Sequence, residues 1–221
     1  MTYYQDCVLA YLDILGWSEL TRESQSCPEI IAELDAAIRT SVEGWEGRTP
    51  LHMIQFAQFS DHLCISCPTS VGYSVTPVLH WVGAIALRLV KMGYATRGAI
   101  VAGPLVHTGN RIFGPALVEA HEIESKVAKY PRLVLSDRAV ELVATEPPPV
   151  RPVRRKDVDG LTFVDIFAVV ESVEEIEKIR AALARRPHRE ALDVRSKRGW
   201  LLEQLRQREI NIRSTPCSTA L

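Results

Sequence analysis

The sequence has no large excess of charge and no long uninterrupted apolar run. Across its 221 residues, 26 Lys and Arg balance 27 Asp and Glu, which leaves a net charge of −1. No global basic field therefore favours nucleic acid or a membrane surface as a partner. The longest apolar run, around residues 78–90, is interrupted by His80, Gly83 and Arg88, and the first residues lack the features of a signal peptide. Affinity for an anionic substrate must come from a local site.

The sequence also lacks a cysteine pattern typical of a zinc site or a disulfide framework. Its five cysteines are an odd number at scattered positions. Cys64 and Cys67 have CxxC spacing, but they lie in a predicted strand, where positions i and i+3 face opposite sides. We therefore expect no zinc site, and the free thiols indicate a reduced, cytoplasmic location.

Two apolar stretches end in a carboxylate. The first, CVLAYLDILGW, runs from Cys7 to Trp17 and contains Asp13 just before the turn that Gly16 permits. The second, QFAQFSDHLC, predicts a hairpin with Asp61 at its tip. A single aspartate at a strand end is more often a cap. Two of them favour a site for Mg²⁺ or Mn²⁺, which prefer carboxylate oxygens and substrate phosphates.

At these residues the sequence resembles class III nucleotidyl cyclases. YLDILGW is similar to their first metal-binding stretch, FSDHLCIS to their second, and the segment Arg97–Ser125 to their strand–loop–helix segment. The resemblance covers residues 7–170 and implies a cyclase catalytic domain over 1–170. Residues 171–221 are expected to form a C-terminal helical extension, either within the same domain or as a dimerisation appendage.

The predicted fold class is α+β, an α/β sandwich with a ferredoxin-like βαββαβ core. Periodicity and turn residues predict each element. The expected helices are Trp17–Ser24, Pro28–Trp45, Val75–Met92, Pro115–Lys129, Ser136 to about Ala144, and Val173–Arg213 broken at Pro187. The expected strands are one ending at Asp13, then Leu51–Phe59, Leu63–Cys67, Thr96–Ala102, Arg132–Leu135 and Leu161–Val170, with Glu146–Lys156 as a surface loop.

The resemblance implies a catalytic centre with two cations, Mn²⁺ or Mg²⁺. Asp13 and Asp61 would bind both cations, with the backbone carbonyl of Ile14 as a further ligand. Arg97 would bind phosphate as a catalytic residue, although a surface charge on an edge strand is an equal alternative. The predicted nucleotide-binding residues are Phe56, Gln58, Arg97 and Arg111, and Gln55 and Phe59 are alternatives because the strand register is open.

The sequence departs from the purine cyclases of the family at four positions. Ala57 stands where they carry an adenine-reading lysine, and Arg111 stands where they carry an acidic or polar residue. Val118 and Glu122 replace the Asn–Arg pair that stabilises the transition state. The segment FGPALVEAHEIES instead resembles the stand-alone pyrimidine cyclases of the Pycsar anti-phage system.

That resemblance implies a lyase, a uridylate cyclase that converts UTP to 3′,5′-cyclic UMP and pyrophosphate. Arg111 as a donor would suit the carbonyl oxygens of uracil. The enzyme would be a homodimer with sites at the subunit interface, and its product would switch on a separate effector protein in anti-phage defence. The alternatives are a cytidylate cyclase acting on CTP, a non-catalytic nucleotide-binding sensor and a structural interaction module.

Overall fold

One mixed sheet forms the centre of the computed structural model, which describes residues 3–42, 54–148, 153–185 and 192–214. Its strands follow the order β2-β3-β1-β4-β6-β8-β7, and β5 pairs with β4. The strands are β1 (Gln5–Ile14), β2 (Gln55–Phe59), β3 (His62–Pro68), β4 (Thr96–Thr108), β5 (Arg111–Phe113), β6 (Leu133–Leu135), β7 (Arg154–Lys156) and β8 (Thr162–Val164).

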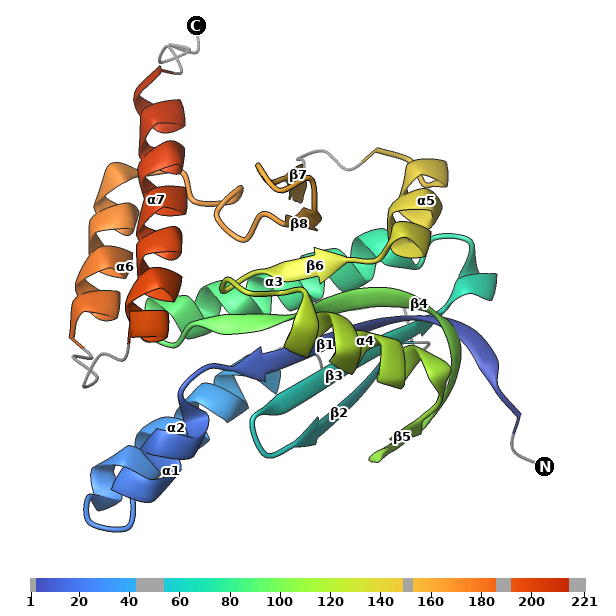
Figure 1. The fold of residues 1–221 in the computed structure, drawn as a ribbon, viewed down its shortest axis with the longest axis horizontal. Helices are drawn as coiled ribbons and strands as arrows, with labels where there is room; N and C mark the ends of the chain where they lie inside the picture. The colour runs from blue at the N-terminus through green and yellow to red at the C-terminus, as the bar shows by residue number, and fades with distance from the viewer. Residues whose placement is uncertain (1–2, 43–53, 149–152, 186–191, 215–221) are drawn as a thin grey trace, which may run out of the picture.

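Helices cover both faces of this sheet. In Figure 1, α4 lies in front of the sheet and α3 lies behind it. The helices are α1 (Trp17–Glu23), α2 (Pro28–Val42), α3 (Val75–Lys91), α4 (Pro115–Lys126), α5 (Asp137–Thr145), α6 (Val173–Ala184) and α7 (Leu192–Ser214), with a 3₁₀ turn at Thr69–Val71. The predicted α+β class is confirmed.

The first half of the chain has the ferredoxin-like arrangement. The order of elements up to β4 is strand, helices, two strands, helix, strand, and β1 runs antiparallel to both β3 and β4 between them. This strand order, β2-β3-β1-β4, is that of a βαββαβ unit. The predicted core is therefore confirmed.

The central strand β1 is buried on both faces, which explains why its sequence is almost uniformly apolar. Val8, Leu12 and Ile14 lie in the cluster that includes residues of α3. Leu9 and Tyr11 belong to the opposite cluster, with residues of α4. Successive side chains of a strand alternate between faces, so Asp13 faces the α4 side of the sheet.

The helices α6 and α7 pack against the end of α3. Their buried side chains form one cluster with residues of α3 and of the segment after β8 (Leu87, Val90, Phe167, Val170, Ile176, Ile179, Leu183, Leu201 and Leu205). Lys91 of α3 also lies 2.6 Å from Glu175 of α6. The apolar side chains of Leu183, Leu201 and Leu205 are thus buried within the chain.

Three strand predictions need correction. β4 continues past its predicted end at Ala102 to Thr108 and returns through β5, which was not predicted. Arg154–Lys156 forms β7 and pairs with β8, whereas Glu146–Lys156 was predicted as a loop. β8 ends at Val164 and not at Val170. The missed strands are three residues long, too short to show an alternating pattern, and their pairing is set by tertiary neighbours.

In the described part of the chain, no helix is both long and apolar enough to cross a membrane.

Candidate active site

Four side chains form a row across four neighbouring strands on the α4 face of the sheet. Residues directly opposite each other in an antiparallel pair point to the same face. His62 of β3 is opposite Asp13 of β1 and also opposite Phe59 of β2, and Asp13 is opposite Arg97 of β4. We call this set the site row: Phe59, His62, Asp13 and Arg97.

A tight turn brings Asp61 to the site row. Because Phe59 pairs with His62, Ser60 and Asp61 form a two-residue hairpin loop. Such loops favour a positive φ, normally supplied by glycine, and here Ser60 adopts a φ of 54°. The N–H of Ile14 donates to the carbonyl of Asp61 at 3.2 Å. This bond holds the turn against the end of β1, beside Asp13.

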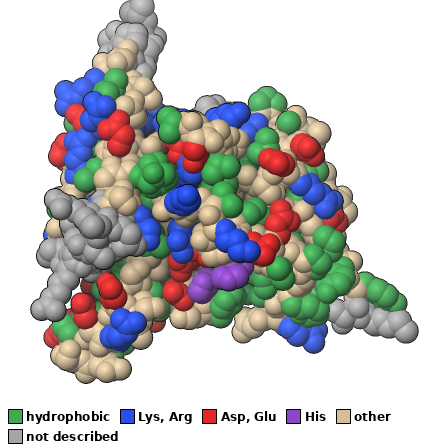
Figure 2. Space-filling view, in the orientation of Figure 1, with side chains coloured by type: hydrophobic (Ala, Val, Ile, Leu, Met, Phe, Trp, Pro, Cys, Tyr) green, Lys and Arg blue, Asp and Glu red, His purple; other side chains and the backbone are tan. Residues whose placement is uncertain are grey.

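His62 lies between the two carboxylates. Its Nδ1 is 3.1 Å from Oδ1 of Asp61, and its Nε2 is 3.8 Å from Oδ1 of Asp13. One ligand atom from each of the three residues lies within 4.8 Å of the others, so this group can hold a metal ion. Figure 2 shows histidine side chains next to acidic and basic ones on this face of the molecule.

A third carboxylate lies on the other side of Arg97. Glu124 of α4 is 3% exposed and forms an ion pair with the guanidinium of Arg97. Nη2 of Arg97 is also 3.6 Å from Oδ2 of Asp13. The Nε of Arg97 is buried and has no hydrogen-bond partner among the described residues. Arg97 is therefore held between two carboxylates, with one buried donor left unsatisfied within the described part of the chain.

Burial and neighbouring charge perturb the acidity of this site. Burial, and then the charge of Glu124, raise the pKa of Asp13 from 3.8 to about 6, against the lowering effect of His62 and Arg97. Burial likewise raises the pKa of Tyr11, which lies two residues before Asp13 on the same face of β1. The site contains three carboxylates, Asp13, Asp61 and Glu124, and one guanidinium, so it has an excess of negative charge that a divalent cation would offset.

The donor set fits the cation that the resemblance implies. Carboxylate oxygens are the ligands that Mg²⁺ and Mn²⁺ prefer, and Asp13 and Asp61 provide them on adjacent strand ends. The structure thus brings together Asp13, Asp61 and Arg97, the three residues predicted as catalytic. Ile14 adjoins them through its bond to Asp61, and its carbonyl as a ligand stays a prediction.

Two predicted nucleotide-binding residues face the wrong side of the sheet. Phe56 packs against the cluster on the α3 side, and Gln58, opposite Leu63, has the same orientation. A shift of one residue along a strand moves a side chain to the other face. A ligand beside Asp13 would instead meet Gln55 and Phe59, and Phe59 is 43% exposed.

Arg111 lies far from the site row within one chain. It pairs with Thr108 near the end of β4, whereas Arg97 is near its beginning. The separation is roughly 36 Å measured along the strand at the usual rise per residue. Figure 1 shows β5 curling away at the far end of β4. Arg111 could meet a ligand at the site row only from a second copy of the chain.

Two functional candidates were missed in the sequence, His62 and Glu124. His62 follows Asp61 directly and shares the face of Asp13, which the alternation of the hairpin could have indicated. Glu124 continues the buried stripe of α4 that Ala116 and Ala120 begin. A lone acidic residue at that helical spacing was the available signal, since a buried carboxylate requires a partner.

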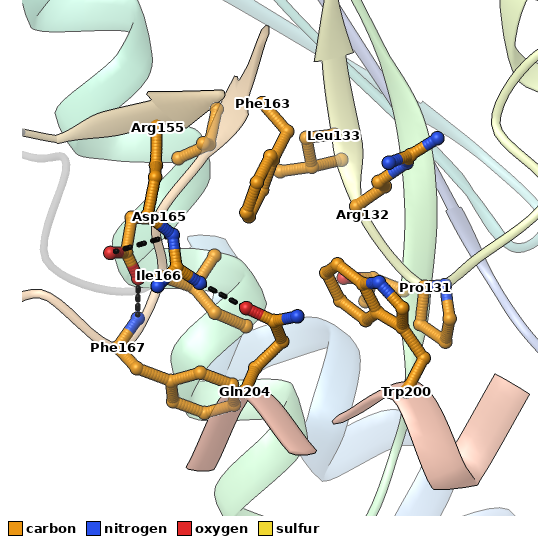
Figure 3. Close-up of a pocket in the computed structure, with 12 residues that line it drawn as sticks. Pro131, Arg132, Leu133, Arg155, Phe163, Asp165, Ile166, Phe167, Trp200 and Gln204 are labelled. Atoms are coloured by element: carbon orange, nitrogen blue, oxygen red, sulfur yellow. Dashed lines mark hydrogen bonds and ion pairs between the residues drawn. The ribbon is translucent and has the colours of Figure 1, made fainter. Parts of the chain in front are cut away.

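A separate pocket lies between the sheet and α7 (Figure 3). Trp200 and Phe163 meet there edge to face, with ring centroids 5.6 Å apart. Arg155 donates to Gln204 and lies 3.7 Å from Asp165. These polar groups satisfy one another and join α7 to β7 and the segment after β8. Asp165 therefore has a partner, Arg155, and lies outside the metal cluster.

Comparison with models of known families and with curated proteins gives no match. Several solved structures are similar. The guanylyl cyclase domain of a RhoGC fusion protein from the fungus Blastocladiella emersonii is 12% identical over 74% of this chain and 98% of its own, with a TM-score of 0.45. A bacterial light-regulated adenylyl cyclase is 11% identical over 83% of this chain and 59% of its own, with a TM-score of 0.49.

A third similar structure is a class III adenylyl cyclase-like ATP-binding protein from Pseudomonas aeruginosa. It is 13% identical over 96% of this chain and 45% of its own, with a TM-score of 0.44. Since these TM-scores are all below 0.5, the function of this chain has to be argued from its site.

Proposed function

We propose that this chain is a divalent-metal-dependent nucleotidyl cyclase that converts UTP to 3′,5′-cyclic UMP and pyrophosphate. One observation carries the proposal: Asp13 and Asp61 meet beside a histidine within 4.8 Å, with the guanidinium of Arg97 3.6 Å from Asp13. Acidic metal ligands next to a cationic donor are what transfer of a phosphoryl group requires.

The cations, two per site and either Mn²⁺ or Mg²⁺, would lower the pKa of the ribose 3′-hydroxyl and neutralise charge on the leaving pyrophosphate. Asp13 and Asp61 would hold them, with the Ile14 carbonyl as a further ligand. Arg97 would bind a phosphate of the substrate through its guanidinium, since the side chain is 21% exposed beside Asp13. Glu124 would keep the Arg97 side chain directed at that phosphate.

The choice of UTP rests on the residues that would face the base. Ala57, on the Asp13 face and 2% exposed, offers no donor for a purine-reading contact. Phe59 offers an exposed ring for a pyrimidine, and Gln55 shares its face. Arg111 would donate to a uracil carbonyl. Cytosine presents an amino group in place of the O4 carbonyl of uracil, so a donor that faces C4 would reject CTP.

Arg111 can take this role only in a homodimer in which each site draws on both subunits. A symmetric dimer places the same residue of each chain at equivalent sites. Mixing of Asp61→Asn subunits with Arg111→Glu subunits should then restore roughly a quarter of wild-type activity, because half of the dimers contain one intact site. Two inactive variants that stay inactive when mixed and re-formed as dimers would refute site sharing.

The biological role proposed is that of a messenger-producing enzyme in anti-phage defence, with a separate effector that binds cyclic UMP. A non-catalytic nucleotide sensor is the second candidate. It is favoured by Val118, which is 61% exposed, and by Glu122, which pairs with Lys126. Neither side chain supplies the Asn–Arg pair of active purine cyclases.

Equal concentrations of ATP, GTP, CTP and UTP with Mn²⁺, followed by mass spectrometry of the products, test the proposal. Cyclic UMP should be the main product. Cyclic CMP would overturn the choice of base, and cyclic AMP or cyclic GMP would overturn the pyrimidine assignment. Binding of a triphosphate without turnover would favour the sensor.

A further inference from the structure

The imidazole of His62 is held in place by its neighbours on both sides in the sheet. The ring stacks on Phe59 of β2 with centroids 5.3 Å apart and 14° between the planes. The ring of Tyr11, on β1, lies 5.1 Å away. Two aromatic contacts fix the orientation of the imidazole, so its nitrogens are presented at a defined place between Asp61 and Asp13.

The two nitrogens have different partners. Nδ1 lies at hydrogen-bond distance from Oδ1 of Asp61, at 3.1 Å. In the neutral ring, a proton on Nδ1 donates to that carboxylate and leaves the lone pair on Nε2. Metal-ligating histidines commonly donate their other N–H to a carboxylate in this way, which fixes the tautomer.

Nε2 then faces another electron-pair donor. Oδ1 of Asp13 is 3.8 Å away from it, too far for a hydrogen bond. Two ligands about 2.1 Å from one cation lie about 3 Å apart when they are cis and about 4 Å apart when they are trans. The observed separation is closer to the second value, so a shift of less than about 0.5 Å would let one cation bind both atoms.

We infer that His62 is a nitrogen ligand of this metal site and makes it prefer Mn²⁺ to Mg²⁺. The inference rests on the metal-binding part of the proposed function. Imidazole binds transition metals well, whereas Mg²⁺ prefers oxygen and keeps its waters. A site with two carboxylates alone would discriminate less between the two ions. His62 would therefore determine which of the two cations the site prefers.

Electron spin-echo envelope modulation of Mn²⁺ bound to the nucleotide-free protein tests directly whether His62 is a ligand. Wild type should show modulation from an imidazole ¹⁴N, and protein labelled with ¹⁵N-histidine should change that pattern without any substitution. His62→Asn, whose amide nitrogen can donate to Asp61 from near the position of Nδ1 but which has no atom in place of Nε2, should lose the modulation. His121→Ala is the matched control, because His121 is 62% exposed and faces Glu124 instead; it should keep the modulation.

Selectivity is measured by displacing Mn²⁺ with Mg²⁺. His62→Asn should bind Mn²⁺ at least about tenfold more weakly, while the affinity for Mg²⁺ changes less than about threefold. Thermal unfolding verifies that each variant is folded. Absence of nitrogen modulation in wild type, an unchanged pattern after ¹⁵N labelling, or an equal loss of both ions would overturn the inference. A chain that binds Mn²⁺ through His62 but makes no cyclic nucleotide would instead refute only the proposed function.

Discussion

Replacement of Asp13 by asparagine should stabilise the metal-free protein while removing its metal site. The Asp13 carboxylate is mostly buried, with 13% of its side chain exposed, and Glu124 and Asp61 add repulsion. These effects disfavour its charged form in the folded chain. Asparagine resembles the protonated carboxyl in shape and cannot ionise, so the variant avoids this cost.

The size of the effect follows from the pKa. The folded-state pKa of about 6 lies above the reference value of 3.8, so the folded state binds the proton more tightly than the unfolded state. The contribution of Asp13 to stability therefore falls as pH rises between these values. At 1.36 kcal/mol per unit, the full cost is about 3 kcal/mol, reached above about pH 7. About 2 kcal/mol of it should develop between about pH 4.5 and about pH 8.

Urea unfolding in the presence of a chelator, at several pH values, measures this difference. The stability of Asp13→Asn minus that of wild type should rise with pH by the amounts above. Asp35→Asn, a change at an exposed residue of α2, should differ from wild type by a constant amount. Adding Mn²⁺ at 100 times its dissociation constant should stabilise wild type by about 2.7 kcal/mol and the variant not at all. A difference that is flat with pH, or a variant less stable than wild type at pH 8 in chelator, would refute the reasoning.

Three further predictions concern single contacts. Glu146 accepts from the N–H groups of Ser74, Val75 and Thr76 at the start of α3, at 2.7, 2.7 and 2.8 Å. Glu146→Ala should therefore lower the free energy of unfolding in urea by about 2–3 kcal/mol. Glu141→Ala, an exposed change in α5, should lower it little, and equal effects would contradict a capping role for Glu146. Arg97→Ala should lower the free energy of unfolding by about 3 kcal/mol, because it leaves Glu124 buried without its partner. Adding Glu124→Gln should recover most of that loss. If the effects of the two substitutions simply add in the double variant, the buried pair is not the cause. Gly98→Ala should destabilise the protein by about 2 kcal/mol or more, because the new Cβ would clash with the Tyr11 carbonyl and lie 3.0 Å from Cα of Leu12. Gly103→Ala, whose Cβ would meet nothing closer than 3.6 Å, should be nearly neutral. Similar losses in the two variants would show that the close approach of β1 and β4 is not the cause.

The elements that bring the site together could be predicted because their signals are local. The apolar runs that end at Asp13 and Asp61, and the turn residues between β2 and β3, are read within about ten positions of the sequence. The metal-binding pair follows from those two strand ends. The ion pair of Arg97 with Glu124 does not, because it depends on how α4 lies over the sheet.

The sequence alone could not predict which residues of β2 face the nucleotide base. Phe56 and Phe59 are both aromatic, and only the pairing of β2 with β3 decides which one faces Asp13. Similarly, β5 exists because β4 continues past Ala102 and turns back at Gly109, where φ is 56°. Such pairing is settled by contacts between distant segments, which a single sequence does not display.

If Asp13 and Asp61 form the proposed metal-dependent cyclase centre, product formation at matched protein concentration should require both the metal and the two carboxylates. Purified wild type with UTP and Mn²⁺ should release pyrophosphate and cyclic UMP in equal amounts, and a chelator should stop both. Asp61→Asn, verified as folded by its thermal unfolding, should form neither. Turnover by the folded Asp61→Asn variant close to that of wild type, or no cyclic nucleotide from wild type with any of the four triphosphates, would contradict the assignment.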